Sequence, residues 1–308
     1  MTGAFSVALF AVAQPYELTE GSDLFGELGA YKTAPDDTLL KVAEVNKLGF
    51  IELVAANPGI DSWLPGPDVT LVLPTLHLLP RGKRAGIVIN LPEQRLYQFL
   101  PDGRVQSFPV VAGNSVCEPE PGQTVIEQRR REPSWRPTAA VRAKRPDLPV
   151  VVPPGPRNPL GKYALDLALP GKIVHGARRP FSDRGGKGHG CIQLYTDDMA
   201  VLYGASRKGM EVAVIDQPIK LGWSDGELYL EVHPTREQGV DLSGLRRMRY
   251  VQVPGFDTLL AEAAGSDLDR VDRVLARKLL RERKGIPVKI SRPRPPPKAK
   301  KVRGLFGP

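Results

Sequence analysis

The sequence predicts an α+β protein, with a β-rich central domain between a small N-terminal βααβ module and a small C-terminal α/β module. From Gly86 onward, stretches that alternate apolar and polar residues are joined by short turns, a pattern typical of an antiparallel sheet. On both sides of this region, short segments carry apolar residues at helical spacing. With 308 residues, the chain is long enough for two or three domains.

The chain begins with an apolar run that ends in Ala11-Val12-Ala13, an A-x-A cleavage pattern. We therefore expect residues 1–13 to be a signal peptide of an exported, periplasmic or cell-envelope protein, with Gln14 as the new N-terminus. The run lacks the usual preceding Lys or Arg, and the alternative is a buried first strand. No other stretch approaches the about 18 apolar residues of a membrane-spanning helix, so we expect no transmembrane segment in the mature chain.

Residues 29–79 predict the strand–helix–helix–strand module. Thr38 and the two acidic residues before it can cap a helix that carries Leu39, Val42 and Val45. A second helix over 50–56 ends at Asn57-Pro58-Gly59, a strong turn signal. Strands over 29–32 and 69–73 complete the module.

Residues 84–218 predict the central domain. Strands are expected over 87–90, 95–99, 105–111, 163–169 and 172–175, and the last of these places His175 at a strand end. Two prolines hold the segment around Trp135 extended, and we expect this tryptophan to be a hydrophobic anchor near a substrate cleft. Residues 150–161 form a long Pro/Gly loop, and such loops in compact domains are often functional.

Residues 219–290 predict the C-terminal module. A turn at Asp225-Gly226 leads into a strand over 228–233, followed by helices over 256–264 and 267–283 and a short strand over 287–290. The second helix is expected to place five residues on one apolar face: Leu268, Val271, Val274, Leu275 and Leu279. Residues 291–308 are Pro-rich, basic and without an acidic residue, so we expect a disordered tail.

The net charge of +9 arises from 43 Lys and Arg against 34 Asp and Glu. Such a balance is compatible with nucleic acid, an anionic membrane surface or the acidic bacterial wall. The signal-like N-terminus and the lack of a nucleic-acid-binding motif argue against nucleic acid as a partner.

The stretch His175–Tyr195 carries the candidate chemistry. Gly185, Gly186, Gly188 and Gly190 predict a loop, which ends at the strand-like residues 191–195. A cysteine is a strong nucleophile as a thiolate, and a nearby imidazole is the usual base, so His175 and His189 are candidates. The alternatives are a buried structural cysteine and a metal site. The His-x13-His-x-Cys spacing is not that of a zinc site and no fourth ligand is evident, so we expect neither metal nor cofactor.

His175-Gly176, a spacer and then Gly188-His189-Gly190-Cys191-Ile192-Gln193 resemble the signature of the L,D-transpeptidases with a YkuD-type catalytic domain. The segments 86–90, 133–138 and 152–161 resemble the ErfK/YbiS-like branch of that family. Gly188 stands where the family usually has Ser or Thr, and Gln193 stands where it usually has Arg. Residues 29–79 resemble a LysM module, which binds the N-acetylated sugars of peptidoglycan. The alternative for that segment is a packing module without affinity for glycan.

The resemblance implies a peptidoglycan L,D-transpeptidase with a YkuD-like sandwich or barrel. The Cys191 thiolate would attack the L-centre carbonyl of diaminopimelate in a tetrapeptide stem, release D-Ala and pass the acyl group to an amine. That amine would belong to another stem, giving a 3→3 cross-link, or to an envelope protein. His175 would be the base and later the acid, His189 would support it, and backbone N–H groups including that of Gly190 would bind the oxyanion. The alternatives are a hydrolase of the same fold and a catalytically inactive wall-binding protein.

The same resemblance implies substrate-binding roles for Gly176, Gly188, Gln193, Arg184 and Trp135. Since Gln193 replaces a cationic residue, Arg178, Arg179, Arg184 or Lys187 could supply the missing charge. We expect Gln193 itself to brace the Cys191 loop, because it lies two residues past Cys191 and on the same side of the strand. The resemblance assigns no role to Cys117, and we expect its thiol to stay separate from that of Cys191.

Overall fold

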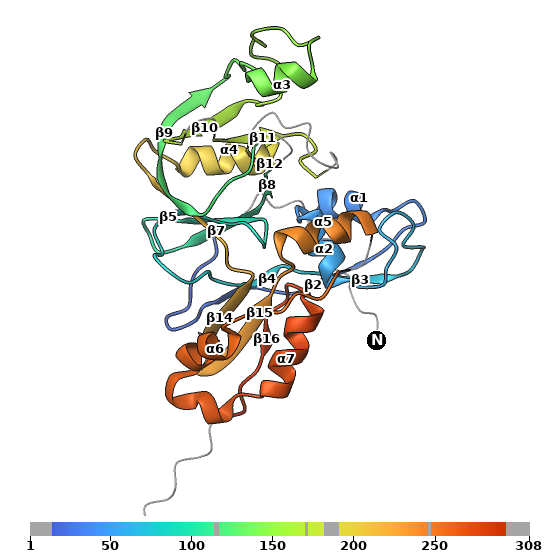
Figure 1. Cartoon of the computed structure of the whole chain (residues 1–308), viewed down its shortest axis with the longest axis vertical. Coiled ribbons are helices and arrows are strands. Elements are labelled where there is room, and N and C mark those ends of the chain that lie inside the picture. Colours follow the sequence, from blue (N-terminus) through green and yellow to red (C-terminus); the bar gives the residue numbers. More distant parts are fainter. Residues whose placement is uncertain (1–13, 114–116, 170–171, 182–190, 246–247, 294–308) are drawn as a thin grey trace, which may run out of the picture.

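A computed structural model describes residues 14–113, 117–169, 172–181, 191–245 and 248–293. The central sheet domain lies above, the βααβ module at its side and the C-terminal module below (Figure 1). The expected signal peptide and residues 294–308 of the expected tail lie outside the described part. In the described part, no helix has both the length and the apolar character needed to cross a membrane.

The strand–helix–helix–strand order of the N-terminal module is confirmed. Strands β2 and β3 pair antiparallel, with Tyr31 opposite Leu71. The Thr38 hydroxyl accepts a hydrogen bond from the Lys41 backbone N–H and so caps the first helix, as the sequence predicts. The elements are β2 (Gly29–Lys32), α1 (Leu39–Asn46), α2 (Phe50–Ala56) and β3 (Thr70–Leu73).

The central domain is a nine-stranded sheet in the order β7-β6-β5-β13-β9-β10-β11-β12-β8. Its two edge strands are consecutive in the chain and are joined through Val110, so the sheet curls into a nearly closed barrel. The strands are β5 (Gly86–Asn90), β6 (Arg95–Phe99), β7 (Val105–Pro109), β8 (Val111–Ala112), β9 (Gly122–Arg131), β10 (Tyr163–Leu167), β11 (Ile173–Ala177), β12 (Ile192–Tyr195) and β13 (Glu211–Ile215).

The prediction of an antiparallel sheet is confirmed for six of the eight neighbouring pairs in this sheet but not for the other two. Strand β13 pairs parallel with β5, and β11 pairs parallel with β12. Parallel neighbours require a long connection, and α4 (Thr196–Ala205) lies in the connection that leads to β13. The ten-residue β9, which we did not predict, bends from β13, paired by residues 122–125, to β10, paired by residues 126–131.

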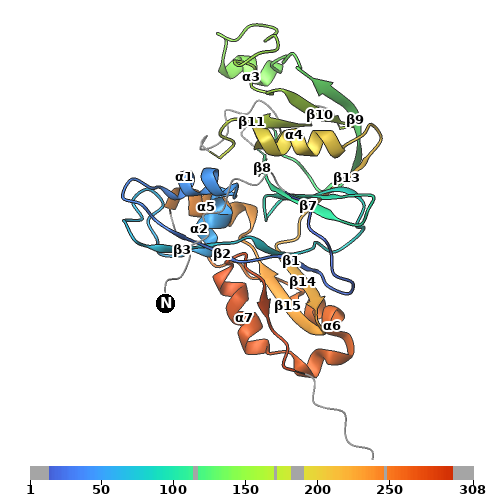
Figure 2. The same cartoon turned by 180° about the vertical axis from the view of Figure 1, so that it is seen from behind.

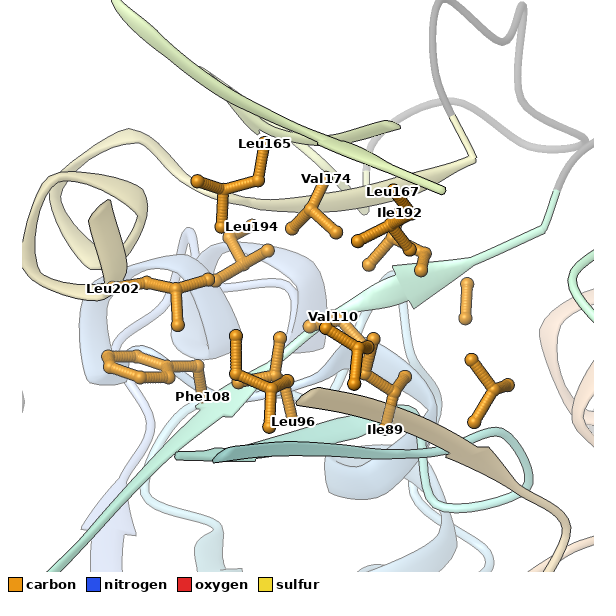
Figure 3. Packing of buried hydrophobic residues seen from close by; sticks show 14 of the residues in the cluster. Ile89, Leu96, Phe108, Val110, Leu165, Leu167, Val174, Ile192, Leu194 and Leu202 are labelled. Carbon is orange, nitrogen blue, oxygen red and sulfur yellow. The ribbon is translucent and has the colours of Figure 1, made fainter. Parts of the chain in front are cut away.

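The core of this domain lies between its two curled halves. Ile89, Leu96 and Phe108 from one half face Val174 and Leu194 from the other (Figure 3). Leu202 and Met199 of α4 close the core on one side. A short helix α3 (Ala139–Lys144) lies in the connection between β9 and β10.

The C-terminal module contains an antiparallel sheet with α6 and α7 packed against it (Figure 2). The prediction of one continuous helix over 267–283 is wrong, because two separate helices occupy this range. Val271 is extended and bridges to Ser291, and the Asp272 side chain accepts from the Leu275 N–H, so a new helix begins there. Val274 is 81% exposed and does not belong to the apolar face. The elements are β14 (Ile219–Ser224), β15 (Glu227–Val232), α6 (Phe256–Ala264), a 3₁₀ helix (Gly265–Arg270), α7 (Arg273–Glu282) and β16 (Val288–Lys289).

Three further segments connect the parts. Strands β1 (Leu24–Gly26) and β4 (Leu76–Leu78) pair with each other, and α5 (Arg236–Leu245) packs Leu242 into the core of the βααβ module. The expected disorder from residue 291 is wrong for residues 291–293. Ser291 is buried and its hydroxyl accepts from the Leu228 N–H, which holds this part of the tail on β15.

A buried ionic cluster joins all three parts. Lys220 donates to Glu93 at 2.8 Å and lies 3.0 Å from Glu231, and Arg95 reaches Glu52 of α2 at 2.5 Å. His77, Glu93 and Glu231 have the composition of a metal site, but the Lys220 ammonium already supplies the cation there. The members are Glu52, His77, Glu93, Arg95, Lys220, Glu231 and His233, all buried.

Candidate active site

The parallel pairing of β11 and β12 brings His175, on β11, close to Cys191, which immediately precedes β12. Val174 lies opposite Ile192, and His175 lies opposite Gln193. Cys191 is therefore one position before the Val174–Ile192 pair, and His175 is one position after it. The sequence predicts His175 at the end of a strand. In the structure it lies near the end of β11, with only Gly176 and Ala177 after it in the strand.

The His175 ring is held in one orientation. Its side chain is 1% exposed, and its Nδ1 lies 3.1 Å from the Gly176 carbonyl oxygen. When Nδ1 carries the proton, it donates a hydrogen bond to this carbonyl oxygen, and Nε2 is then the basic nitrogen. The geometry thus suits a general base.

Gly176 has a packing reason to be glycine. A Cβ at this position would lie 3.2 Å from the Met199 Cβ and 3.3 Å from the Thr196 Cα, so α4 would have to move. Its backbone also supplies the carbonyl that orients His175. Any side chain here would disturb both contacts.

A cavity of about 930 Å³ opens beside His175. His175, Gly176 and Gln193 form one wall, and residues of the 150–161 loop form another. Four cationic side chains and one acidic side chain line it: Arg157, Lys162, Arg178, Arg179 and Glu132. An excess of positive charge favours an anionic ligand.

Asn158, which was not among the predicted site residues, holds the loop that forms this wall. Its buried side-chain amide donates to the carbonyls of Pro133, Val152 and Pro153 at 2.7, 3.2 and 3.1 Å, and its oxygen accepts from the Leu160 N–H at 2.9 Å. One side chain thus replaces the hydrogen bonds that a proline-rich loop cannot form within itself. An Asn amid prolines and glycines was the available signal.

Trp135 is the hydrophobic anchor that the sequence predicts. It is 5% exposed, packs with Val141 and Leu160, and its backbone bridges to Val152. The ring lies beneath the 150–161 loop, and Trp135 is not among the residues that line the cavity. Its role in substrate binding stays a prediction.

Cys191 and Cys117 form a disulfide, with their Cα atoms 5.3 Å apart, so the expectation of two separate thiols is wrong. The physical reason is the pairing of β12 with β8. The Gly113 N–H donates to the Cys191 carbonyl at 2.8 Å, which draws the chain that follows β8 onto Cys191. Cys191 is 1% exposed in this state.

The remaining predicted site residues are only partly described. Gly188, His189, Gly190, Arg184 and Lys187 lie outside the described residues. Gln193 is half-buried on the cavity wall, and among the described residues its side chain makes no hydrogen bond to Cys191. Arg178 and Arg179 line the cavity, as a substitute for the family's arginine would require.

The βααβ module contacts the end of β12. The Tyr195 hydroxyl donates to the Leu48 carbonyl at 3.0 Å, and the Tyr195 ring lies 5.5 Å from that of Phe181, which packs into the module's core. Arg179 lies 3.7 Å from Glu44 of α1. The module is therefore a direct neighbour of the cavity.

Asp198, in the first turn of α4, lies at the same contact. Burial raises the pKa of its carboxyl to about 6, and the neighbouring Lys47 partly opposes this rise. The side chain therefore changes its charge near neutral pH.

Residues 84–214 match the L,D-transpeptidase catalytic domain family, YkuD. The nearly closed mixed barrel, with buried His175 on β11 and buried Cys191 just before β12, is thus an L,D-transpeptidase catalytic domain.

The relatives extend this match beyond the catalytic domain. The chain is 36% identical to the "Probable L,D-transpeptidase ErfK/SrfK" of Escherichia coli K12, covering 88% of this chain and 89% of that protein. It is 32% identical to the "Probable L,D-transpeptidase YbiS" of the same strain, covering 94% and 96%. The catalytic domain of an E. faecium L,D-transpeptidase, solved by NMR, is 18% identical with a TM-score of 0.34, covering 44% of this chain and all of that one. The chain belongs to the ErfK/YbiS family of L,D-transpeptidases.

Proposed function

We propose that this L,D-transpeptidase acts on the tetrapeptide stems of peptidoglycan through the reduced thiol of Cys191. The observation that carries the proposal is the cavity of about 930 Å³, which has His175 on its wall and an excess of cationic side chains around it. Stem peptides carry several carboxylates, so they match this charge.

In the first step, His175 takes the proton of the Cys191 thiol, and the thiolate attacks the carbonyl at the L-centre of diaminopimelate. The C–N bond to D-Ala breaks, and the imidazolium returns its proton to the leaving amine. In the second step, an acceptor amine attacks the thioester, forms an amide and regenerates the thiol. The acceptor is the diaminopimelate of another stem or a lysine of an envelope protein.

The cationic wall binds the carboxylates of the stem. Arg157, Lys162 and Arg178 are exposed at the cavity and close to His175. They supply the positive charge that Gln193 lacks. Gly176 and Gln193 also line this cavity beside His175, and in the proposed complex they lie next to the scissile bond.

The βααβ module is a LysM-like glycan-binding module. Its support is the strand–helix–helix–strand order and its contact with the end of β12, which would bring bound glycan next to the cavity. The domain limits follow from the sequence: 29–79 for this module, 84–218 for the catalytic domain and 219–290 for the C-terminal module. Residues 1–13 direct export to the cell envelope, where a disulfide can form.

Incubation of the reduced protein with disaccharide-tetrapeptide muropeptides tests the activity. We expect loss of D-Ala and a cross-linked dimer in mass spectra, and neither product with Cys191→Ala. A trimmed tripeptide without dimer would indicate a hydrolase, in which water resolves the thioester. Unchanged muropeptides would indicate a wall-binding protein without catalysis.

Co-sedimentation of Cys191→Ala with insoluble peptidoglycan tests the glycan-binding module separately. This variant cannot turn over the wall, so retention reports binding alone. Competition by soluble N-acetylglucosamine oligomers is expected to release it. Retention that these oligomers do not affect would contradict the LysM-like role.

A further inference from the structure

We infer that Cys117 is a redox modification site for the nucleophile: its disulfide with Cys191 withholds the thiolate, and a thiol reductant releases it. This inference rests on the proposed function of Cys191. A sulfur bonded to another sulfur cannot attack a carbonyl, so the oxidised chain is inactive. The described structure is thus the resting, oxidised form of the enzyme.

The two sulfurs differ in access. Cys191 is 1% exposed and belongs to the core of the barrel, whereas Cys117 is only partly buried. An incoming thiolate therefore reaches the Cys117 sulfur first. Exchange proceeds through attack on one sulfur and departure of the other. Cys191, the buried partner, leaves as the thiolate that catalysis needs.

The segment around Cys117 is held in place by contacts other than the disulfide. The Lys172 ammonium donates to the Glu118 carbonyl at 2.6 Å. From the C-terminal module, Arg236 lies 2.9 Å from the Glu118 carboxylate and donates to the Pro119 carbonyl at 3.4 Å. These contacts persist when the disulfide opens, so Cys117 stays close enough to Cys191 for the bond to form again.

The same lysine also acts on the sulfur. Its Nζ lies 3.4 Å from the Cys117 Sγ, and a cation beside a sulfur stabilises the thiolate relative to the thiol. This cation therefore favours the departure of the Cys117 thiolate in the step that frees Cys117 from the reductant. Lys172 thus acts on Cys117 in two ways: its charge stabilises the Cys117 thiolate, and its hydrogen bond to Glu118 holds the segment in place.

Reduction of the disulfide proceeds in two exchange steps. The thiolate of a dithiol reductant forms a mixed disulfide with Cys117 and expels the Cys191 thiolate. The second thiol of the reductant then attacks its own sulfur in the mixed disulfide and expels the Cys117 thiolate. The protein gains two electrons and two protons, and the reductant becomes a cyclic disulfide. Oxidation by a disulfide follows the same steps in reverse.

Full-length protein prepared without reductant tests this inference. We expect wild-type protein, denatured only for the labelling step, to take up no maleimide, and the native protein to form no cross-linked muropeptide. After dithiothreitol it should take up two labels and become active, and oxidised dithiothreitol should reverse both changes. Cys117→Ser should take up one label and be active without any reductant. Wild-type protein that is equally active with and without reductant, or that takes up two labels without it, would overturn the inference.

The number of maleimide labels distinguishes a failure of this inference from a failure of the proposed function. If reduced wild type and Cys117→Ser are both inactive while the labels change as expected, the proposed function of Cys191 is wrong and the reversible disulfide stands.

Lys172→Gln should slow reduction by dithiothreitol about threefold or more, because the thiolate of Cys117 loses its cation. Lys208→Gln, an exposed lysine outside this contact, is the control and should leave the rate unchanged. Equal rates for the two variants would overturn the role of Lys172.

Discussion

Lys220 Nζ lies 2.8 Å from Glu93 Oε1, and both side chains are fully buried where the C-terminal module meets the catalytic domain. The ammonium also donates to the Leu78 carbonyl at 2.7 Å and lies 3.0 Å from Glu231. Its positive charge lowers the pKa of the Glu93 and Glu231 carboxyls against the effect of their burial. One lysine thus compensates two buried acids from different parts of the chain.

Lys220→Met should therefore cost about 3–5 kcal/mol of unfolding free energy, the range for a buried pair that loses one partner. Urea unfolding at neutral pH measures the loss. Lys83→Met is the matched control, because Lys83 pairs with Glu211 at an exposed site, where an ion pair contributes about 0–1 kcal/mol. Similar losses in the two variants would contradict the role given to Lys220.

Asp198→Asn should make the protein more stable at pH 8 than at pH 4, relative to wild type. The pKa of the carboxyl is raised from 3.8 to about 6 by burial, so the native state binds the extra proton between these values. The stability that this provides is present below pH 4 and is lost as the pH rises through about 6. A pKa shift of about two units corresponds to at most about 3 kcal/mol, so Asp198→Asn should gain no more than this in stability at pH 8.

Thermal unfolding across pH 4–8 measures this difference. Asp197→Asn is the control, since the Asp197 side chain is exposed and pairs with Lys47. We expect that variant to show no such gain at pH 8. A difference between Asp198→Asn and wild type that does not change with pH would show that the carboxyl does not titrate as expected.

Local signals account for the parts of the fold that the sequence predicts. Thr38 caps its helix because its hydroxyl needs only a backbone N–H three residues later. The helix Phe256–Ala264 follows from its own apolar spacing. The expected helix over 267–283 is wrong because the bridge between Val271 and Ser291 is a contact over 20 residues, which periodicity does not detect.

The parts that could not be predicted depend on long-range geometry. His175 and Cys191 were found from a motif, but the disulfide joins cysteines 74 residues apart in sequence. Only the pairing of β8 with β12 brings them together. The acids and bases around Lys220 are likewise scattered over α2, β4, β6, β15 and the segments beside these strands, and each alone resembles a surface charge. Sequence patterns identify the chemistry of such residues but not their neighbours.

Asn158→Ala should reduce kcat/KM by about tenfold or more, mainly through a higher KM. The amide donates to three loop carbonyls and accepts one N–H bond, and each buried group left without a partner costs about 1–3 kcal/mol. The 150–161 loop would then lose its shape and, with it, one wall of the cavity. Kinetics of the reduced protein with muropeptides measure this effect.

Asn46→Ala is the matched control for that variant. Its amide donates to the Val42 carbonyl within α1, and Asn46 does not line the cavity beside His175. We expect its KM to match that of wild type. A KM that is equally unchanged in Asn158→Ala would mean that substrate does not contact this loop.

Gln193→Arg should lower the KM for tetrapeptide stems by about tenfold. The side chain is half-buried on the cavity wall, opposite His175 in the β11–β12 pair, where a guanidinium would meet a substrate carboxylate away from bulk water. A hydrogen bond to a charged group contributes about 1.5–3 kcal/mol, and 1.4 kcal/mol corresponds to about tenfold. If Gln193 instead braces the Cys191 loop, which is the expectation from the sequence, the KM of Gln193→Arg should change little. Gln193→Met, of similar size but without donors, is the control, and reduced protein is used throughout. If Gln193→Arg changes neither KM nor kcat beyond the change seen in Gln193→Met, the carboxylate binds to Arg157, Lys162 or Arg178 instead.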